Sequence, residues 1–199
     1  MQTETLVTWV SWLVGAYLVG SVPFGFLIGK MRGVDVRTVG SKNIGATNVY
    51  RTVGKKWGLL AFLCDFLKGL APTLLAKSFY PGEPDLAVAV GMACVVGHTL
   101  TVFMRFKGGK GVATAFGMLM AVIPLLVTAA FVLWALVVWV SHYISLGSCI
   151  AAAFLGAAIW FMPCTLVLKV AMTILAVWVI WKHRSNIVRL AHGCENKIY

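Results

Sequence analysis

The sequence predicts an all-α, polytopic membrane protein, and three observations carry that prediction. Of its 199 residues, 60% are hydrophobic and only 12% are charged, whereas soluble domains are nearer half apolar and a quarter charged. The apolar residues form runs of roughly 20, the length that crosses a bilayer as a helix. The polar residues gather in a few short segments between these runs. At this length we expect one integral membrane domain covering residues 1–199.

The first half of the chain contains three expected spans. The run from Leu6 to Ile28 is long enough to cross and has no positive charge before it, which favours a transmembrane helix over a cleaved signal peptide. A polar stretch, 30–56, follows it. Further spans are expected at about 57–79 and 86–104, separated by the turn sequence YPGEPD.

The number of spans in the second half stays open at this level. From Gly111 to Trp181 the chain is apolar, with interruptions at Pro124, SHYISLGS and FMPC. Both ends of this stretch are basic, so an even number of spans is needed, and two or four both fit. The segment 112–140 would be about 44 Å long as one helix. That exceeds a hydrocarbon core of about 30 Å, so it is either one tilted helix or a short re-entrant pair.

The basic residues predict the orientation. Lys and Arg number 17 against 6 Asp and Glu, a net charge of +11. In a membrane protein this excess indicates cytoplasmic loops and anionic headgroups, and we expect no nucleic acid partner. Most of the basic residues lie in 30–56, in 105–110 and in the tail 182–199. The positive-inside rule places these three segments in the cytoplasm, with the N-terminus outside and the C-terminus cytoplasmic.

The stretch SKNIGATNVYR, 41–51, is the first polar cluster. Arg51 offers a planar fork suited to phosphate oxygens, and Gly45 would let the backbone bend tightly. The alternative is an interfacial loop that caps a short helix and lies on headgroups. Neutral hydrogen-bonding side chains surround Arg51: Ser41, Asn43, Thr47 and Asn48.

The second cluster is KGGKG, in which Gly108, Gly109 and Gly111 surround Lys110 just before an apolar helix. Successive backbone N–H groups there, together with a helix N-terminus, would form an anion-binding nest. The spacing is not that of a Walker A loop, because position 104 is Met where that motif needs Gly. The alternative is an ordinary glycine-rich basic turn.

The third cluster is the tail, where His183, Asn186 and Arg189 recur at a spacing that puts them on one helix face, and Glu195 follows. The alternative is a basic stop signal with a fraying end. Ser148 would join this cluster only with four spans in the second half; otherwise Ser145 and Ser148 are expected to cap a helix.

Two features inside the spans are expected to be structural. Asp65 and Lys68, three residues apart, should form an ion pair. His98 is expected to be a hydrogen-bonded packing residue. Five scattered cysteines without a CxxC or Cys/His pattern predict no metal site.

All three polar clusters lie on one predicted membrane face, which favours a site for anions there. The chain has no internal repeat of the kind common in transporters. An enzyme acting on amphiphiles at the inner leaflet is therefore favoured over an anion transporter, with a lipid phosphotransferase as a third alternative.

The quoted motifs resemble a known family nearly end to end, from GSVPFG through SKNIGATNVYRTVGKK, DFLKG and GHTLTVFMRFKGGKGVATAFG to HRSNIVRLAHGCENK. It is the family of bacterial acyl-phosphate-dependent glycerol-3-phosphate acyltransferases. Two positions depart from its usual pattern: Lys42, where the family often has Gly, and Thr101, where it often has Pro.

The resemblance implies seven transmembrane helices, which favours four spans in the second half. It also implies a multi-pass enzyme of the bacterial inner membrane, with its active site facing the cytoplasm. The enzyme would transfer a fatty acyl group from acyl phosphate to the 1-hydroxyl of sn-glycerol 3-phosphate. The products would be lysophosphatidic acid and phosphate, in the first acylation step of phospholipid synthesis. No cofactor is implied; the partners are both substrates, membrane lipid and the soluble enzyme that produces acyl phosphate.

The residues fit such a reaction. Acyl phosphate is already activated, so no enzyme nucleophile is required, and no GxSxG occurs; the HxxxxD signature of acyl-CoA-dependent acyltransferases is also absent. The resemblance assigns catalysis to Lys110, His183 and Arg51. It assigns substrate binding to Ser41, Asn43, Thr47, Asn48, Gly108, Gly109, Gly111, Ser148, Asn186 and Glu195. For the proton of the attacking hydroxyl two acceptors are open, His183 as a general base or a phosphate oxygen of the substrate. We favour the phosphate oxygen, with His183 positioning substrate by hydrogen bonding.

Overall fold

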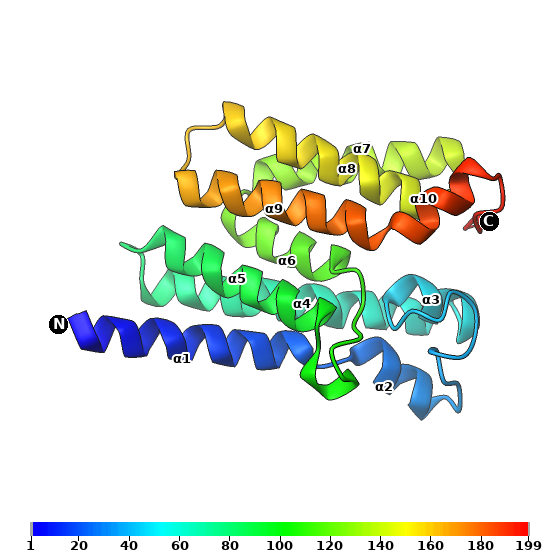
Figure 1. The fold of residues 1–199 in the computed structure, drawn as a ribbon, viewed down its shortest axis with the longest axis horizontal. Helices are drawn as coiled ribbons and strands as arrows, with labels where there is room; N and C mark the ends of the chain where they lie inside the picture. Colours follow the sequence, from blue (N-terminus) through cyan, green and yellow to red (C-terminus); the bar gives the residue numbers. More distant parts are fainter. Residues whose placement is uncertain (1, 199) are drawn as a thin grey trace. The chain divides into compact units, whose positions relative to one another are not determined.

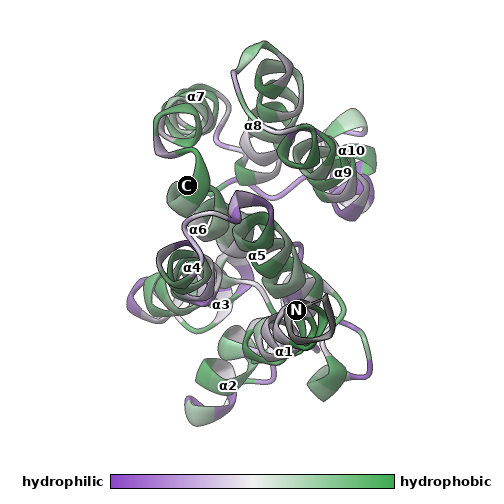
Figure 2. Cartoon of the chain, turned by 90° about the vertical axis from the view of Figure 1, so that its left-hand side faces the viewer, coloured by the Kyte–Doolittle hydropathy of each residue, from purple (hydrophilic) through white to green (hydrophobic). Residues whose placement is uncertain are grey.

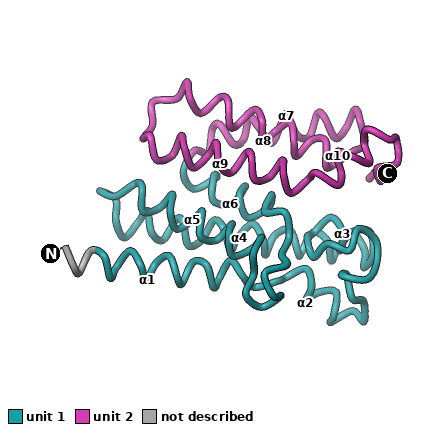
Figure 3. The backbone as a smooth tube through the Cα atoms, in the orientation of Figure 1, with its two compact units in different colours: residues 1–122 teal, residues 123–199 magenta. Residues whose placement is uncertain are grey.

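The computed structural model describes residues 2–198, with side chains from Leu6 onward, and all regular structure in this range is helical (Figure 1). The chain divides into two compact units, residues 1–122 and 123–199, shown in different colours in Figure 3. The helices are mostly apolar along their length, while the polar residues gather in the connecting loops and in α10 (Figure 2).

The elements of the first unit are α1 (Gln2–Ser21), α2 (Phe24–Met31), α3 (Ala46–Thr52), α4 (Lys55–Phe79), α5 (Pro84–Thr99), the 3₁₀ turn η1 (Val102–Met104) and α6 (Val112–Val122). Those of the second are α7 (Pro124–Ser141), α8 (Ile144–Ala158), the 3₁₀ turn η2 (Ile159–Phe161), α9 (Leu166–Lys182) and α10 (Arg184–Ala191).

Five helical stretches within residues 2–198 are long and apolar enough to cross a membrane: Leu6–Met31, Lys55–Phe79, Pro84–Met104, Pro124–Ser141 and Ile144–Phe161. A sixth candidate is α9 together with α10, which meet at a bend of 54°. The apolar helix α6 is shorter, at 11 residues. The prediction of an all-helical, multi-pass chain is confirmed.

Two expected spans are interrupted. The first is broken between α1 and α2, because Pro23 has no N–H to donate to the preceding helical turn. The third leaves α-helical structure after Thr99 and continues through η1. Thr101, at the position where the family often has Pro, is fully buried, and its hydroxyl donates to the Ser21 carbonyl at 2.6 Å. A hydrogen bond to the end of α1 thus holds this bend.

Glycines allow the helices of the first unit to pack closely. A Cβ at Gly20 would overlap the backbone of Cys94, and one at Gly97 would overlap the Tyr17 carbonyl, so α1 and α5 are nearly in backbone contact. Gly117 has the same relation to Phe66, where α6 meets α4. Close backbone approach through small residues is typical of helix pairs in membranes, where packing replaces the hydrophobic effect as the driving force.

Four helices, α6, α7, α8 and α9, occupy the stretch that begins after Gly111 and ends at Lys182. The α-helix α7 ends where His142 takes a left-handed conformation at φ 64°, and α8 begins two residues later. Within the second unit, α8 packs against both α7 and α9, and α10 also contacts α8. The side chain of Thr165 caps α9 by accepting the Leu168 N–H at 3.2 Å.

Candidate active site

Asn48 organises the loop that precedes α3. Its side-chain amide donates to the carbonyls of Val36 (2.8 Å) and Asn43 (2.9 Å), and its Oδ1 accepts the Ser41 N–H at 2.8 Å. Only 1% of Asn48 is exposed. Its hydrogen-bonding capacity is therefore used by the loop backbone. The geometry assigns Asn48 to shaping the loop, and the direct substrate contact expected from the sequence stays a prediction.

The tight bend expected at Gly45 occurs earlier in the chain. Gly45 has an ordinary φ of −76° and stands at the N-cap of α3, where its N–H donates to Asn43 Oδ1 at 2.8 Å. Gly40 and Lys42 are instead left-handed, with φ values of 58° and 56°. Glycine adopts that conformation without steric cost. This explains physically why a glycine suits position 42, although lysine occupies it here.

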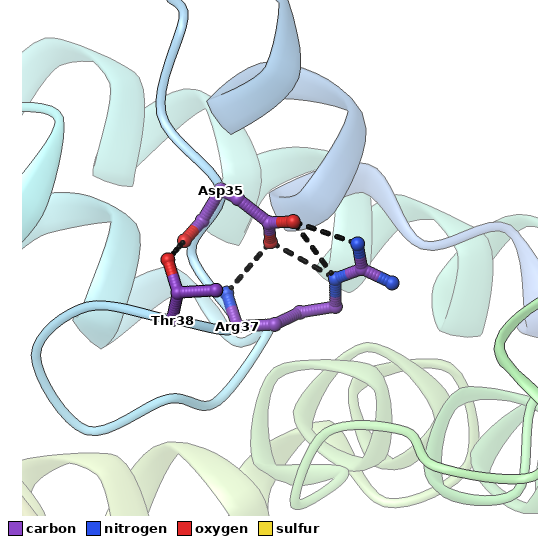
Figure 4. Close-up of polar contacts among 3 residues, drawn as sticks. All are labelled: Asp35, Arg37 and Thr38. Atoms are coloured by element: carbon purple, nitrogen blue, oxygen red, sulfur yellow. Dashed lines mark hydrogen bonds and ion pairs between the residues drawn. The ribbon is translucent and has the colours of Figure 1, made fainter.

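Arg37 is held in place within the same loop (Figure 4). Its Nε and Nη2 donate to the Asp35 carboxylate at 2.9 and 2.6 Å, and its backbone N–H donates to the same group at 3.0 Å. These hydrogen bonds lower the pKa of Asp35 to about 2. Thr38 closes the turn by donating its hydroxyl to the Asp35 carbonyl at 2.9 Å. The guanidinium also lies 4.5 Å from the ring centre of Phe26.

The glycine-rich loop before α6 is paired with the end of α5. The Gly108 N–H donates to the Thr99 carbonyl at 3.2 Å, and the Gly109 N–H donates to the His98 carbonyl at 3.1 Å. The prediction that these two amides would form an anion nest is therefore wrong. Sequence patterns could not reveal this, because the acceptors lie nine and eleven residues back, in another element. Gly111 is left-handed at φ 87°, and α6 begins immediately after it.

Both basic loops of the first unit line one pocket of about 660 Å³. Its lining includes four cationic side chains, one amide and three apolar side chains. The lining residues are Arg37, Lys42, Asn43, Ile44, Phe103, Met104, Arg105, Lys107 and Gly108. The first and second polar clusters expected from the sequence therefore both contribute residues to one pocket. An anion site on one face requires such a meeting of the clusters.

The pocket adds residues that the sequence had marked only as positive-inside charges: Arg37, Arg105 and Lys107. The sequence feature that could have identified these residues is the high density of Lys and Arg next to the two motifs. Seven of the nine expected site residues of this unit are outside the pocket lining. Ser41 is exposed, Thr47, Arg51 and Lys110 are partly buried, and Asn48, Gly109 and Gly111 are buried.

Glu195 holds the tail against α8 and α10 in the second unit. Its Oε1 accepts from Asn186 Nδ2 at 2.6 Å and from the Ser145 hydroxyl at 2.9 Å, while its Oε2 accepts from Arg189 Nε at 2.7 Å. Burial by itself would raise the pKa of Glu195, but these donors outweigh it and hold the pKa below its ordinary value. Glu195 thus orients a cationic neighbour, Arg189. Ser145 does not cap α8.

His183 lies at the junction of α9 and α10 and is 3% exposed. Its Nδ1 is 2.8 Å from the Val179 carbonyl oxygen. A carbonyl only accepts, so Nδ1 carries the proton in this contact. Ser148 is also buried, and its hydroxyl donates back to the Ile144 carbonyl at 2.9 Å. The expectation that Ser148 caps the helix is wrong.

Residues 10–193 match the family described as glycerol-3-phosphate acyltransferase. The chain belongs to this family. A glycerol-3-phosphate acyltransferase of Trichlorobacter lovleyi is 52% identical over 186 residues, covering 94% of this chain and 95% of that protein. One from Aquifex aeolicus is 44% identical and covers 93% and 96%.

Solved structures of an acyltransferase from this family are also similar. The crystal structure of PlsY, an integral membrane glycerol 3-phosphate acyltransferase, in its glycerol 3-phosphate form has a TM-score of 0.91 at 39% identity. Its lysophosphatidic acid form has a TM-score of 0.88 at 38% identity. Each comparison covers 96% of this chain and 95% of the other.

No group of three or more His, Cys, Asp or Glu side chains placed to hold a metal ion occurs among residues 2–198.

Proposed function

We propose that this protein transfers a fatty acyl group from acyl phosphate to the 1-hydroxyl of sn-glycerol 3-phosphate. The products are 1-acyl-sn-glycerol 3-phosphate and inorganic phosphate. The observation that carries the proposal is the pocket with four cationic side chains in a member of the glycerol-3-phosphate acyltransferase family. Both substrates bear phosphate, and such a pocket attracts phosphate groups whatever else the molecule carries.

Acyl phosphate fits the donor role because its leaving group is itself a phosphate. The hydroxyl oxygen of glycerol 3-phosphate attacks the acyl carbon, and the bond from that carbon to the phosphate oxygen breaks. Charge then grows on the departing phosphate, which Lys110 and Arg51, two cations outside the pocket lining, would stabilise. The sequence has no HxxxxD element of the acyl-CoA-dependent enzymes. No covalent acyl-enzyme is needed.

The proton of the attacking hydroxyl passes to a phosphate oxygen of the substrate, and His183 positions the substrate. A phosphate monoester has a second pKa near 6, which suits a proton acceptor at neutral pH. The Nδ1 of His183 donates to a backbone carbonyl rather than to a carboxylate. A carbonyl orients the ring but supplies no negative charge to stabilise an imidazolium.

Two variants distinguish these roles, because Asn retains a donor but cannot act as a base. If His183 positions substrate, His183→Asn should recover much of the activity lost in His183→Ala, mainly through KM for glycerol 3-phosphate. If His183 were the base, both variants would lose about 10²- to 10⁴-fold in kcat. Equal collapse of kcat in both folded variants would contradict the positioning role.

We further propose seven membrane crossings, with the N-terminus outside and the active site at the cytoplasmic face of the bacterial inner membrane. Six candidate spans and the short apolar helix α6 together support this number. The orientation rests on the basic segments 30–56, 105–110 and 182–199 and on the positive-inside rule.

The donor is tested with purified protein in detergent micelles, supplied with glycerol 3-phosphate and either acyl phosphate or acyl-CoA. Lysophosphatidic acid should form with acyl phosphate and not with acyl-CoA. Equal rates with both donors would overturn the donor assignment. A transporter would yield no product in micelles, so the same assay decides against that alternative.

A further inference from the structure

Three ionisable side chains form a buried cluster between α4 and α5. Lys68 Nζ lies 2.7 Å from Asp65 Oδ1, and His98 Nδ1 lies 3.4 Å from the same oxygen. Asp65 is 2% exposed, and the other two are also buried. The ion pair expected from the sequence is confirmed, but the third member and its surroundings are new. Burying such charges is costly unless they satisfy one another.

His98 connects this cluster to the glycine-rich loop. Its carbonyl accepts the Gly109 N–H, and the next carbonyl, that of Thr99, accepts the Gly108 N–H. A Cβ at Gly109 would overlap Nε2 of the His98 ring. The backbone of Gly109 therefore rests directly on the imidazole whose opposite nitrogen faces Asp65. Lys110 follows immediately in the chain.

Lys68 connects the cluster to the break between α1 and α2. Its Nζ donates to the Val22 carbonyl at 2.8 Å and lies 5.5 Å from the ring centre of Phe24. Val22 adjoins Pro23, where the helical hydrogen-bonding pattern is interrupted. The helix α2 then leads into the loop that supplies Arg37 and Lys42 to the pocket. One carboxylate is thus linked, through a lysine and a histidine, to both chain segments that line the pocket.

We propose that Asp65 and His98 are positioning residues for acyl transfer. The carboxylate fixes the imidazole, the imidazole supports Gly109, and the glycine-rich loop then places Lys110 against the phosphate that it stabilises. Lys68 balances the carboxylate and anchors the α1–α2 break. The inference rests on the proposed function, because the role of Lys110 comes from it. A mutation far from the reacting atoms that displaces a catalytic group by about 1 Å can lower the rate about 100-fold.

A mutant cycle tests this inference against simple loss of stability. Asp65→Asn, which keeps the shape of the side chain and removes its charge, is made in the wild type, in Lys110→Met and in Lys107→Met. Lys107 is the matched control, since it is a lysine of the same loop outside the proposed chain of contacts. The product is measured in micelles with whichever acyl donor the wild type uses, and each variant's thermal midpoint is recorded.

We expect Asp65→Asn to lower kcat roughly 10- to 100-fold in the wild type and in Lys107→Met. In the Lys110→Met background, Asp65→Asn should lower kcat by less than about 3-fold. The effects of two substitutions are not additive when one residue acts through the other. If Asp65→Asn lowers kcat by the same factor in all three backgrounds, the inference is overturned. Equal factors would mean that the effect of Asp65→Asn is independent of Lys110. If the wild type is active with acyl-CoA but not with acyl phosphate, the proposed donor is refuted. The mutant cycle can still be measured with acyl-CoA, so the two failures are distinguishable.

If Asp65→Asn does not fold, His98→Asn replaces it in the same cycle, because an Asn amide can occupy the place of the ring Nδ1. It is also combined with Gly109→Ala, a change that forces a Cβ into the ring. The loss from Gly109→Ala should be clearly smaller in the His98→Asn background than in the wild type. Unchanged loss would show that the imidazole does not support the loop and would overturn the inference.

Discussion

Replacing Glu195 by Gln isolates the charge of the carboxylate that holds the tail. Gln keeps one carbonyl oxygen, which can still accept from Ser145 and Asn186, but it loses the charged hydrogen bond with Arg189. Such a bond contributes about 1.5–3 kcal/mol. The Arg189 side chain is 34% exposed, so solvent screening favours the lower end, about 1.5 kcal/mol. For a chain of this size that corresponds to about 3–6 °C in thermal midpoint.

Glu195→Ala should be much more damaging. It leaves the buried donors of Ser145 and Asn186 without their acceptor, and each unpaired buried group costs about 1–3 kcal/mol. Added to the lost charged bond, the total is roughly 4–7 kcal/mol. Thermal unfolding followed by tryptophan fluorescence in detergent would measure both variants. Because Asn186 is also a proposed substrate ligand, KM for glycerol 3-phosphate should rise in both.

The ordering of the two variants is the decisive result. Equal destabilisation by Gln and Ala would show that the charge alone matters and that Ser145 and Asn186 gain nothing from the retained oxygen. No change in either variant would show that the carboxylate does not hold the tail in solution. Ser145→Ala is the matched control, because it removes one neutral donor and should cost only about 1 kcal/mol.

Four further outcomes are expected. Lys110→Met should reduce kcat/KM by about 10- to 150-fold, the effect of one charged hydrogen bond, and Lys107→Met by less; similar mild losses would contradict the special role of Lys110. Activity should survive EDTA, and loss with EDTA that added Mg²⁺ restores would contradict a metal-free reaction. In a cysteine-free background, a cysteine at position 42 should be labelled from the cytoplasmic side and one at Glu83 from outside; external labelling at 42 would reverse the orientation. The lowered pKa of Glu195 means that its stabilisation is complete above its ordinary pKa of 4.5 and is lost as pH falls through the lower folded-state value. The difference in thermal midpoint between wild type and Glu195→Gln should therefore become smaller as the pH is lowered below 4.5. A difference that stays constant would contradict a stabilising charge on Glu195.

The sequence predicted the helices well because apolar runs and breaks are local properties. The turn at YPGEPD and the interruptions near Pro124 and His142 all occur where the pattern changes. The broken first span was missed because the surrounding run stays apolar through Pro23. The short helix α2 was for the same reason merged into one long span.

The site was less predictable, because its hydrogen bonds join residues distant in sequence. Asn48 was grouped with ligands, yet its partners are backbone groups of a loop up to twelve residues away. The Gly108 and Gly109 amides were expected to face an anion, but α5 supplies their acceptors. Ser145 was expected to cap a helix, and its acceptor is Glu195, fifty residues later. Residue types indicated which segments hold polar clusters, but only the tertiary structure shows the hydrogen-bond partners of each side chain.

The pairing of the glycine-rich loop with α5 has a consequence for the behaviour of the protein in salt. With the Gly108 and Gly109 amides already paired, the attraction for phosphate in this pocket comes from four side-chain cations, all of them exposed: Arg37, Lys42, Arg105 and Lys107. Charges of this kind are screened, over about 8 Å at physiological ionic strength and about 3 Å in molar salt. Affinity for phosphate-bearing substrates should therefore weaken steadily as salt is added. The ionic strength at the membrane surface then sets how well this pocket captures its substrates.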